Sequence, residues 1–341
     1  MDRPVTLKDL AKELNVSITT VSKAINNHPD ISEKRKREIL SYAQEANYVP
    51  NAIAKNLRKQ SSALVGIVLN DNANPNNARV IKGIELCLSE NGYHAIIMNN
   101  GESVEKEMVL VKELLSLNVA GVLLCPASGN SKSSEFLKKA GIPCVLINRY
   151  ISRDNDSYVI IDDESAAYSA VRYLTTYGNK KIFFLNYLSM VSTSKGRLEG
   201  YKKALADNNI KFNTEYVIDN CLNQAHGYET MNRILGKHSP PFSVFCYSDY
   251  IAIGALCALQ ERGFQSPGDT PVMGMDDLDI LSFVKPRLST IAIPKLRLGY
   301  RAAELLIELM NWKLDGNVLS DVFLENKRIV MDTEMIIRET C

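Results

Sequence analysis

Loops that follow short apolar runs carry the side chains best suited to bind a ligand. The run Leu64–Leu69 opens into an asparagine-rich loop, and the run Pro143–Ile147 opens into Asn148 and Arg149. Amide, carboxylate and guanidinium groups in one place suit a polyhydroxylated ligand, because each hydroxyl both donates and accepts a hydrogen bond. Loop solubility alone explains an isolated residue such as Asn74, so the hypothesis depends on whether these loops converge.

A second group of polar side chains lies in the first sixty residues. Residues 1–60 contain 11 Lys and Arg against 7 Asp and Glu, a net charge of +4, whereas residues 61–341 have a net charge of −3. The segment from Ser17 to Lys23 is rich in short polar side chains, which suit contacts with the base edges and phosphates of DNA. A surface that docks another protein more often exposes Leu, Met or aromatic residues.

Three short helices are predicted to position this polar segment. Thr6 and Asp9 have the spacing of a capping box at the start of the first helix. Ser17 and Ser32 are good N-caps for the second and third helices, and Lys34–Arg37 is expected to face solvent on the third. Such a bundle is either a small interaction domain or a helix-turn-helix whose second helix enters the major groove. The polar face of the second helix favours DNA binding.

Apolar runs and amphipathic stretches alternate from residue 62 onward. The runs are Leu64–Leu69, His94–Met98, Val119–Cys125, Pro143–Ile147, Ile182–Leu185, Val244–Cys246 and Val272–Met275. This alternation predicts parallel sheets with helices on both faces, and a break near Ile161 and Asp162 predicts two such lobes. Ligands bind beyond the carboxyl ends of strands in open parallel sheets, so the loops after the strands are the expected binding site.

Composition and motifs argue against several other classes of protein. No apolar run approaches the roughly 20 residues of a membrane-spanning helix, and the N-terminus lacks a secretory signal, so we expect a soluble, cytoplasmic protein. The seven cysteines form no Cys-x-x-Cys pair and the four histidines are dispersed, so we expect reduced thiols, no metal and no cofactor. We find no Gly-x-Ser-x-Gly, phosphate-loop or His-Glu-x-x-His motif, and therefore expect no enzyme. A sugar-transport protein would carry a signal peptide and would lack the N-terminal helices.

Three N-terminal segments and several landmarks of the body resemble the lactose repressor/galactose repressor (LacI/GalR) regulators. The N-terminal segments are Val5–Ala11, Val16–Asn26 and Asn47–Ala52. The landmarks are Gly83–Glu85, Gly196–Gly200, Ser248–Asp249, Gly274–Asp277 and Leu288–Ile291. The resemblance covers effectively the whole chain. It implies an N-terminal all-α helix-turn-helix domain and an α/β, periplasmic-binding-protein-like body of two doubly wound parallel-sheet lobes.

The resemblance and the apolar pattern together divide the chain into four parts. Residues 1–49 form the helix-turn-helix domain, and residues 50–61 form a hinge helix and linker. The N-terminal lobe of the effector domain comprises residues 62–161 and 292–320, and the C-terminal lobe comprises residues 162–291 and 321–341.

The resemblance also implies which residues contact DNA. Ile18, Thr19 and Lys23 occupy positions that select operator bases, and Lys23 stands where many relatives carry Arg, which weakens the expectation of a bidentate contact to guanine. Contacts with phosphates are implied for Thr6, Ser17, Thr20 and Ser22. The hinge helix is implied to fold on the minor groove, with Leu57 wedged into the central base step. Its implied contact residues are Asn51, Ala54, Lys55 and Leu57.

The effector site implied by the resemblance combines residues from distant loops. The positions are Asn76, Asn77, Asn148, Arg149, Thr193, Arg197, Leu222, Ser248 and Asp276, with Arg197 and Asp276 the strongest candidates. Asn76 and Asn77 replace aromatic side chains that often follow the Pro in relatives. This difference argues against a purine and favours a sugar or sugar derivative.

The resemblance implies that the protein is a transcription regulator that acts as a repressor. A small effector is expected to control its affinity for a palindromic operator. The effector shifts the population of lobe arrangements, and both induction and corepression satisfy this linkage. Paired recognition helices require a homodimer. No heptad pattern follows Thr340, so we do not expect a coiled-coil tetramer. Control by a phosphocarrier protein also stays open.

Overall fold

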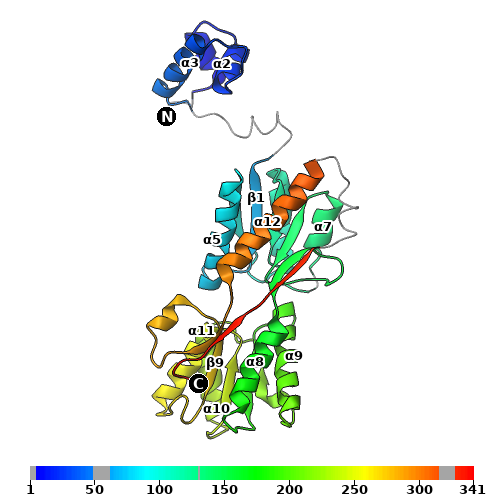
Figure 1. The fold of residues 1–341 in the computed structure, drawn as a ribbon, viewed down its shortest axis with the longest axis vertical. Helices are drawn as coiled ribbons and strands as arrows, with labels where there is room; N and C mark the ends of the chain where they lie inside the picture. The colour runs from blue at the N-terminus through cyan, green and yellow to red at the C-terminus, as the bar shows by residue number, and fades with distance from the viewer. Residues whose placement is uncertain (1–4, 49–61, 130, 315–326) are drawn as a thin grey trace. The chain divides into compact units, whose positions relative to one another are not determined.

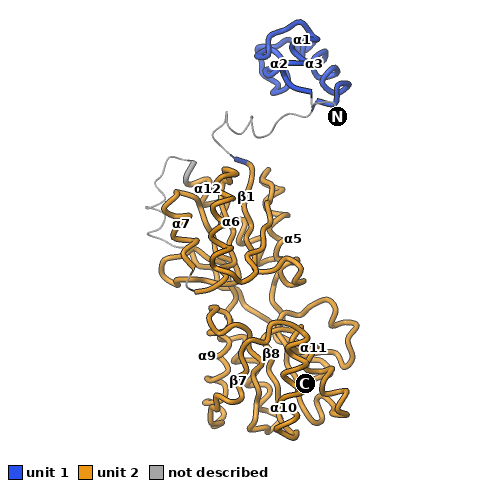
Figure 2. The backbone as a smooth tube through the Cα atoms, turned by 180° about the vertical axis from the view of Figure 1, so that it is seen from behind, with its two compact units in different colours: residues 1–62 blue, residues 63–341 orange. Residues whose placement is uncertain are grey.

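Residues 5–48, 62–129, 131–314 and 327–341 are described by the computed structural model. The chain divides into two units, residues 1–62 and residues 63–341, which Figure 2 draws in different colours. Each unit has a hydrophobic core of its own. Among the described residues, no helix is both long and apolar enough to cross a membrane.

The first unit consists of helices α1 (Leu7–Glu13), α2 (Ile18–Ile25) and α3 (Glu33–Glu45). The predicted capping box is present at α1: the Thr6 hydroxyl accepts a hydrogen bond from the Asp9 N–H, and the Asp9 carboxylate accepts one from the Thr6 N–H at 2.9 Å. These bonds satisfy backbone N–H groups that have no partner inside the helix.

The core of the first unit takes apolar side chains from all three helices. The fully buried members are Leu10, Val21 and Ile39. Ser32 is the N-cap residue of α3, as predicted, but its side chain makes no capping hydrogen bond. One expectation for α3 is wrong. Lys36 does not face solvent: it is buried, and its ammonium lies 2.9 Å from the Glu33 carboxylate, which compensates the buried charge.

The second unit contains two six-stranded sheets, which confirms the predicted doubly wound architecture. The first sheet is entirely parallel and has the order β11-β5-β4-β3-β1-β2. Its strands are β1 (Leu64–Leu69), β2 (His94–Asn99), β3 (Gly121–Leu124), β4 (Cys144–Ile147), β5 (Tyr158–Ile161) and β11 (Arg328–Met331). The second sheet has the order β12-β10-β9-β8-β6-β7, with β12 antiparallel to β10. Its strands are β6 (Ile182–Leu185), β7 (Val217–Ile218), β8 (Ser243–Cys246), β9 (Val272–Asp276), β10 (Ser289–Ala292) and β12 (Glu334–Ile336).

Helices cover both faces of each sheet (Figures 1 and 2). In the first lobe, α5 (Pro75–Glu90) and α12 (Lys295–Leu314) pack on one face, and α6 (Val104–Ser116) and α7 (Ser133–Lys139) on the other. In the second lobe, α8 (Asp163–Thr175) and α9 (Ser192–Asp207) lie opposite α10 (Gln224–Leu235) and α11 (Asp249–Glu261). Phe184 and Phe183 point to these two opposite faces, as the alternation of a strand requires.

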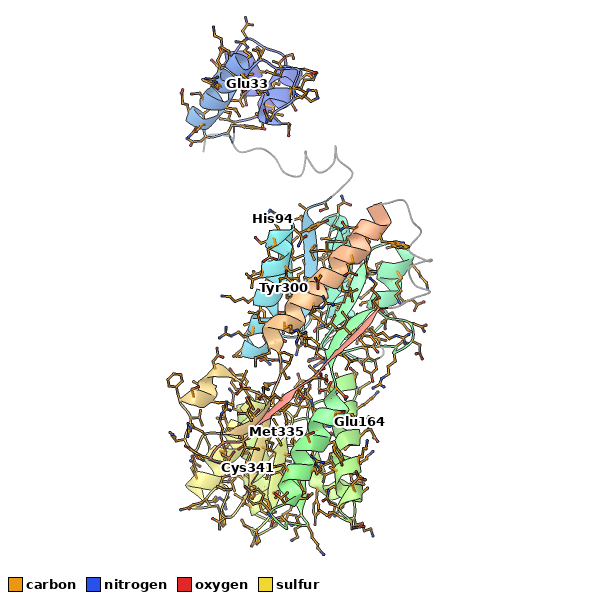
Figure 3. All side chains as sticks on the ribbon, in the orientation of Figure 1. Glu33, His94, Glu164, Tyr300, Met335 and Cys341 are labelled. Carbon is orange, nitrogen blue, oxygen red and sulfur yellow. The ribbon has the colours of Figure 1, made fainter. Side chains whose placement is uncertain are left out.

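Glycines allow the backbones of neighbouring helices to touch. A Cβ atom added at Gly83 of α5 would lie 2.0 Å from the Leu296 carbonyl oxygen of α12, and one added at Gly299 would lie 2.0 Å from the Val80 carbonyl oxygen. Beside this contact, the Tyr300 hydroxyl, labelled in Figure 3, donates to the Glu90 carboxylate at 2.7 Å. Gly200 and Gly254 allow the same approach between α8 and α9 and between α10 and α11. The helices that support the binding loops are therefore closely packed against each other.

The chain passes between the two sheets after β5, after β10 and after β11. We expected residues 321–341 in the C-terminal lobe, and this is wrong for residues 328–331. They form β11, which pairs in parallel with β5, so that Met331 lies opposite Ile161. The following strand β12, with Met335 labelled in Figure 3, belongs to the second sheet. An edge strand is defined by a partner that is remote in sequence, and its own residue pattern does not identify that partner.

Candidate functional site

Helix α2 presents the side chains that the sequence predicts for DNA. Val21 and Ala24 face the core, whereas Thr19 is exposed and Ile18 retains 45% of its accessible surface. The Ser17 hydroxyl caps the helix by accepting from the Thr20 N–H at 3.0 Å. An exposed apolar residue beside hydroxyl groups suits contact with a thymine methyl and with base edges.

Lys23, on the same helix, is held by an ion pair. Its ammonium lies 2.7 Å from the Asp30 carboxylate, and His28 Nδ1 lies 3.3 Å from the same oxygen. The hydrogen bond from Lys23 and the nearby His28 lower the pKa of Asp30. The predicted DNA contact of Lys23 would require it to exchange this partner for a DNA acceptor. The predicted hinge contacts lie outside the described residues: Asn51, Ala54, Lys55 and Leu57.

In the second unit, the loops after the strands converge on a cavity of about 140 Å³. Every effector position predicted from the sequence lines it: Asn76, Asn77, Asn148, Arg149, Thr193, Arg197, Leu222, Ser248 and Asp276. These residues come from both lobes, at or beyond the carboxyl ends of β1, β4, β7, β8 and β9 and from α9. The structure thus brings the predicted positions together, and which of them contact an effector stays a prediction.

Each lobe contributes one buried arginine that has a carboxylate partner. The two terminal nitrogens of Arg149 donate to the two oxygens of Glu102 at 2.7 and 2.9 Å. Arg197 Nε donates to Asp163 at 2.8 Å, and its guanidinium lies 4.0 Å from the centre of the Tyr247 ring. Burial raises the pKa of Asp163, and the Arg197 charge opposes that shift. The positive charge of both arginines is therefore compensated within the protein.

Two tyrosines that sequence reasoning did not assign to the site also line the cavity. The Tyr187 and Tyr247 rings stack with their centres 5.0 Å apart and an angle of 20° between them. The Tyr247 hydroxyl lies 2.8 Å from the Thr193 hydroxyl. Asn76 and Asn77 of the first lobe leave their own edge of the cavity without an aromatic side chain, whereas the second lobe contributes these two rings to the lining. The available signal was a tyrosine within two residues of the end of an apolar run.

Asp276 is the cleft carboxyl with the most perturbed pKa. It is buried at the end of β9 with a backbone φ of 124°. Burial and the neighbouring Asp249 raise the pKa of Asp276 to about 8, against the opposing charges of Arg197 and Lys295. The raised pKa favours the protonated carboxyl, which can both donate and accept a hydrogen bond.

Two asparagines at the start of α5 differ in whether their side chains have hydrogen-bond partners. The Asn77 amide donates to Asn70 Oδ1 at 2.8 Å and to the Asp71 carbonyl at 2.6 Å. The buried side-chain oxygen of Asn76, in contrast, has no hydrogen-bond partner in the structure. An unpaired buried acceptor is costly, and Asn76 is also one of the residues that line the cavity. Among the described residues, no group of three His, Cys, Asp or Glu side chains is placed to hold a metal ion.

Sequence comparison with known families accounts for both units. A family model described as bacterial regulatory proteins, lacI family, matches residues 6–51. A second, described as periplasmic binding proteins and sugar binding domain of LacI family, matches residues 62–326. The chain belongs to the LacI family. It is a DNA-binding transcription regulator with an effector domain, and not an enzyme.

Individual LacI-family proteins resemble the chain over its full length. The HTH-type transcriptional regulator MalR of Clostridium butyricum is 31% identical over 343 residues, which cover 98% of each chain. The solved complex of the transcriptional regulator CelR with cellobiose is 25% identical, with a TM-score of 0.74 over 99% of this chain and 100% of that one. The lac repressor dimer bound to operator and the anti-inducer ONPF is 23% identical, with a TM-score of 0.85 over 99% of both chains, and shares the fold.

The raised pKa of Asp276 predicts a specific pH dependence of stability. A carboxyl whose pKa is raised by folding stabilises the fold below its unfolded pKa, and this contribution is lost as the pH rises through the folded value, here about 8. The melting temperature of Asp276→Asn should therefore increase relative to that of the wild type as the pH rises from 5 to 8.5. The measurement is thermal unfolding across that range, with the exposed Asp207→Asn as control. A constant difference between Asp276→Asn and the wild type at every pH would contradict the assignment.

Proposed function

We propose that the cleft binds a neutral, polyhydroxylated effector of about one sugar ring, and that this ligand controls operator binding. The single observation that carries the proposal is that both cleft arginines already have carboxylate partners, Glu102 and Asp163. The guanidinium groups therefore offer directed N–H donors without a net positive charge. An anionic effector would find no uncompensated cation in these two pairs.

The remaining polar groups also suit hydroxyls. The Asn76 oxygen needs a donor, while a protonated Asp276 carboxyl can serve either as donor or as acceptor. A sugar hydroxyl can play either role in return. The Tyr187 and Tyr247 rings, whose faces are covered by each other and by the two arginines, add apolar ring edges to the cavity wall.

The volume of the cavity limits the size of the ligand. An engineered cavity of roughly 150 Å³ binds a single benzene ring, and the cleft encloses about 140 Å³. One six-membered ring therefore fits this arrangement of the lobes. The relative CelR was solved with cellobiose, which supports a sugar-type effector. Because aromatic side chains line the cavity, nucleobases are the alternative class to be tested.

We infer that the helix-turn-helix unit reads a palindromic operator as a homodimer in the cytoplasm. Ile18, Thr19 and Lys23 select bases, and Thr6, Ser17, Thr20 and Ser22 contact phosphates. The hinge positions Asn51, Ala54, Lys55 and Leu57 contact the minor groove. The effector shifts the population of lobe arrangements and thereby the operator affinity, by induction or by corepression. A phosphocarrier protein is the candidate regulator if no small molecule binds.

A thermal-shift screen against sugars, polyols, sugar phosphates and nucleobases tests the effector class. We expect a neutral sugar to raise the melting temperature and Arg197→Ala to weaken its binding at least about tenfold, because a hydrogen bond from a charged group is lost. Asp276→Asn is a second, nearly isosteric variant should Arg197→Ala not fold. Arg172→Ala, exposed on α8, is the control. Stabilisation by sugar phosphates or nucleobases alone would contradict the proposal.

Selection of binding sites from a random DNA library tests the DNA-reading residues. Lys23→Ala should lower the affinity for the selected operator about five- to hundredfold and relax the base preference at one position of each half-site. Lys12→Ala removes the same charge from an exposed position on α1 and should leave the base preference unchanged. An unaltered base preference in the Lys23 variant would show that Lys23 does not read a base.

A further inference from the structure

The Glu102 carboxylate forms one of the hydrogen bonds that cross between the two lobes, and this one lies beside residues of the effector cavity. Glu102 lies between β2 and α6 of the first lobe, and Tyr187 follows β6 of the second. The Tyr187 hydroxyl donates to Glu102 Oε1 at 2.9 Å. Burial and the Glu102 charge raise the pKa of Tyr187, so the phenol keeps its proton and remains a donor.

Glu102 has little capacity left to bind a ligand itself. Arg149 donates to both of its oxygens, and the Asn70 amide donates to Oε1 at 2.9 Å. With Tyr187 the carboxylate accepts four hydrogen bonds, about as many as its lone pairs allow. Its side chain is only 17% exposed, and it does not line the cavity. Glu102 therefore acts on residues that do line the cavity.

The partners of Glu102 connect to the rest of the site. Arg149 is fixed in orientation by two parallel bonds to the carboxylate, which is the most specific geometry for a guanidinium. The Tyr187 ring stacks on Tyr247, whose ring faces Arg197 at 4.0 Å. A continuous series of contacts thus leads from the arginine of one lobe through Glu102 to the arginine of the other.

The backbone at Glu102 is held in an unfavourable conformation. Its φ is +61°, and among the described residues it is the one non-glycine residue with positive φ that is neither Asn nor Asp. The Glu102 N–H donates to Asn100 Oδ1 at 3.0 Å, and the buried Asn100 amide donates to Glu107 at 3.0 Å. Such conformations persist where the surrounding structure enforces them, and they are concentrated at functional sites.

We propose that Glu102 is the positioning residue of the effector site, which holds Arg149 of the first lobe and Tyr187 of the second in one arrangement. The inference rests on the proposed function of the cleft. Lobe separation breaks the Glu102–Tyr187 hydrogen bond, so effector affinity and lobe arrangement are coupled through this carboxylate.

Hydrogen exchange of the full-length, ligand-free protein tests the positioning role without any effector. The variants are Glu102→Gln, Tyr187→Phe and the double variant. The control is Glu105→Gln, an exposed carboxylate at the start of α6. Gln is isosteric with Glu but places N–H groups against the Arg149 donors. We expect amides of residues 148–150 and 186–193 to exchange at least about threefold faster in each single variant. The double variant should exchange no faster than the faster single variant, because both changes break one interaction.

Additive effects of the two substitutions, or exchange in Glu102→Gln equal to that of Glu105→Gln, would overturn the positioning role. A second measurement uses the sugar that most stabilises the wild type in the thermal-shift screen. Its affinity should fall about tenfold in Glu102→Gln and stay unchanged in Glu105→Gln. Equal affinity for Glu102→Gln and the wild type would also overturn the proposal. Absence of any stabilising sugar refutes the proposed effector, whereas the exchange experiment alone decides whether Glu102 couples the lobes.

Discussion

The need to compensate buried charge governs the cleft of this LacI-family protein. Arg149 and Arg197 are each about 5% exposed, and a guanidinium without a partner at such depth would destabilise the fold by several kcal/mol. Glu102 and Asp163 remove that cost and fix the direction of the guanidinium N–H groups at the same time. The proposed preference for a neutral ligand and the contact between the lobes through Glu102 both follow from how these charges are paired.

The fold supplies the convergence that this pairing requires. Parallel strands end at the same edge of a sheet, so loops far apart in sequence meet beside one cavity. Within each lobe, neighbouring helices that support those loops touch through Gly83, Gly200 and Gly254. The DNA-binding unit needs no such convergence of distant loops. Its small apolar core leaves the polar face of α2 exposed.

Local patterns in the sequence predicted local structure well. Capping residues located the starts of α1 and α2, and apolar runs located the central strands. The resemblance to a family supplied effector positions that all line one cavity. The partners of those residues were missed, because Glu102 lies 47 residues from Arg149 and Asp163 lies 34 residues from Arg197. No periodicity encodes such pairs. The sequence pattern also missed the place of the edge strand β11 and the burial of Lys36, because tertiary contacts determine both environments.

Reciprocal coupling between effector and operator tests the central claim most directly. The effector found by screening and the operator found by selection are each titrated in the absence and in the presence of the other, in one buffer. Coupled sites change each other's affinity by the same factor, typically about 5- to 150-fold. We predict that the two affinity changes are equal factors and that both differ from one. Both factors should move towards one in Glu102→Gln. A factor of one in both titrations would show that the cleft does not control DNA binding.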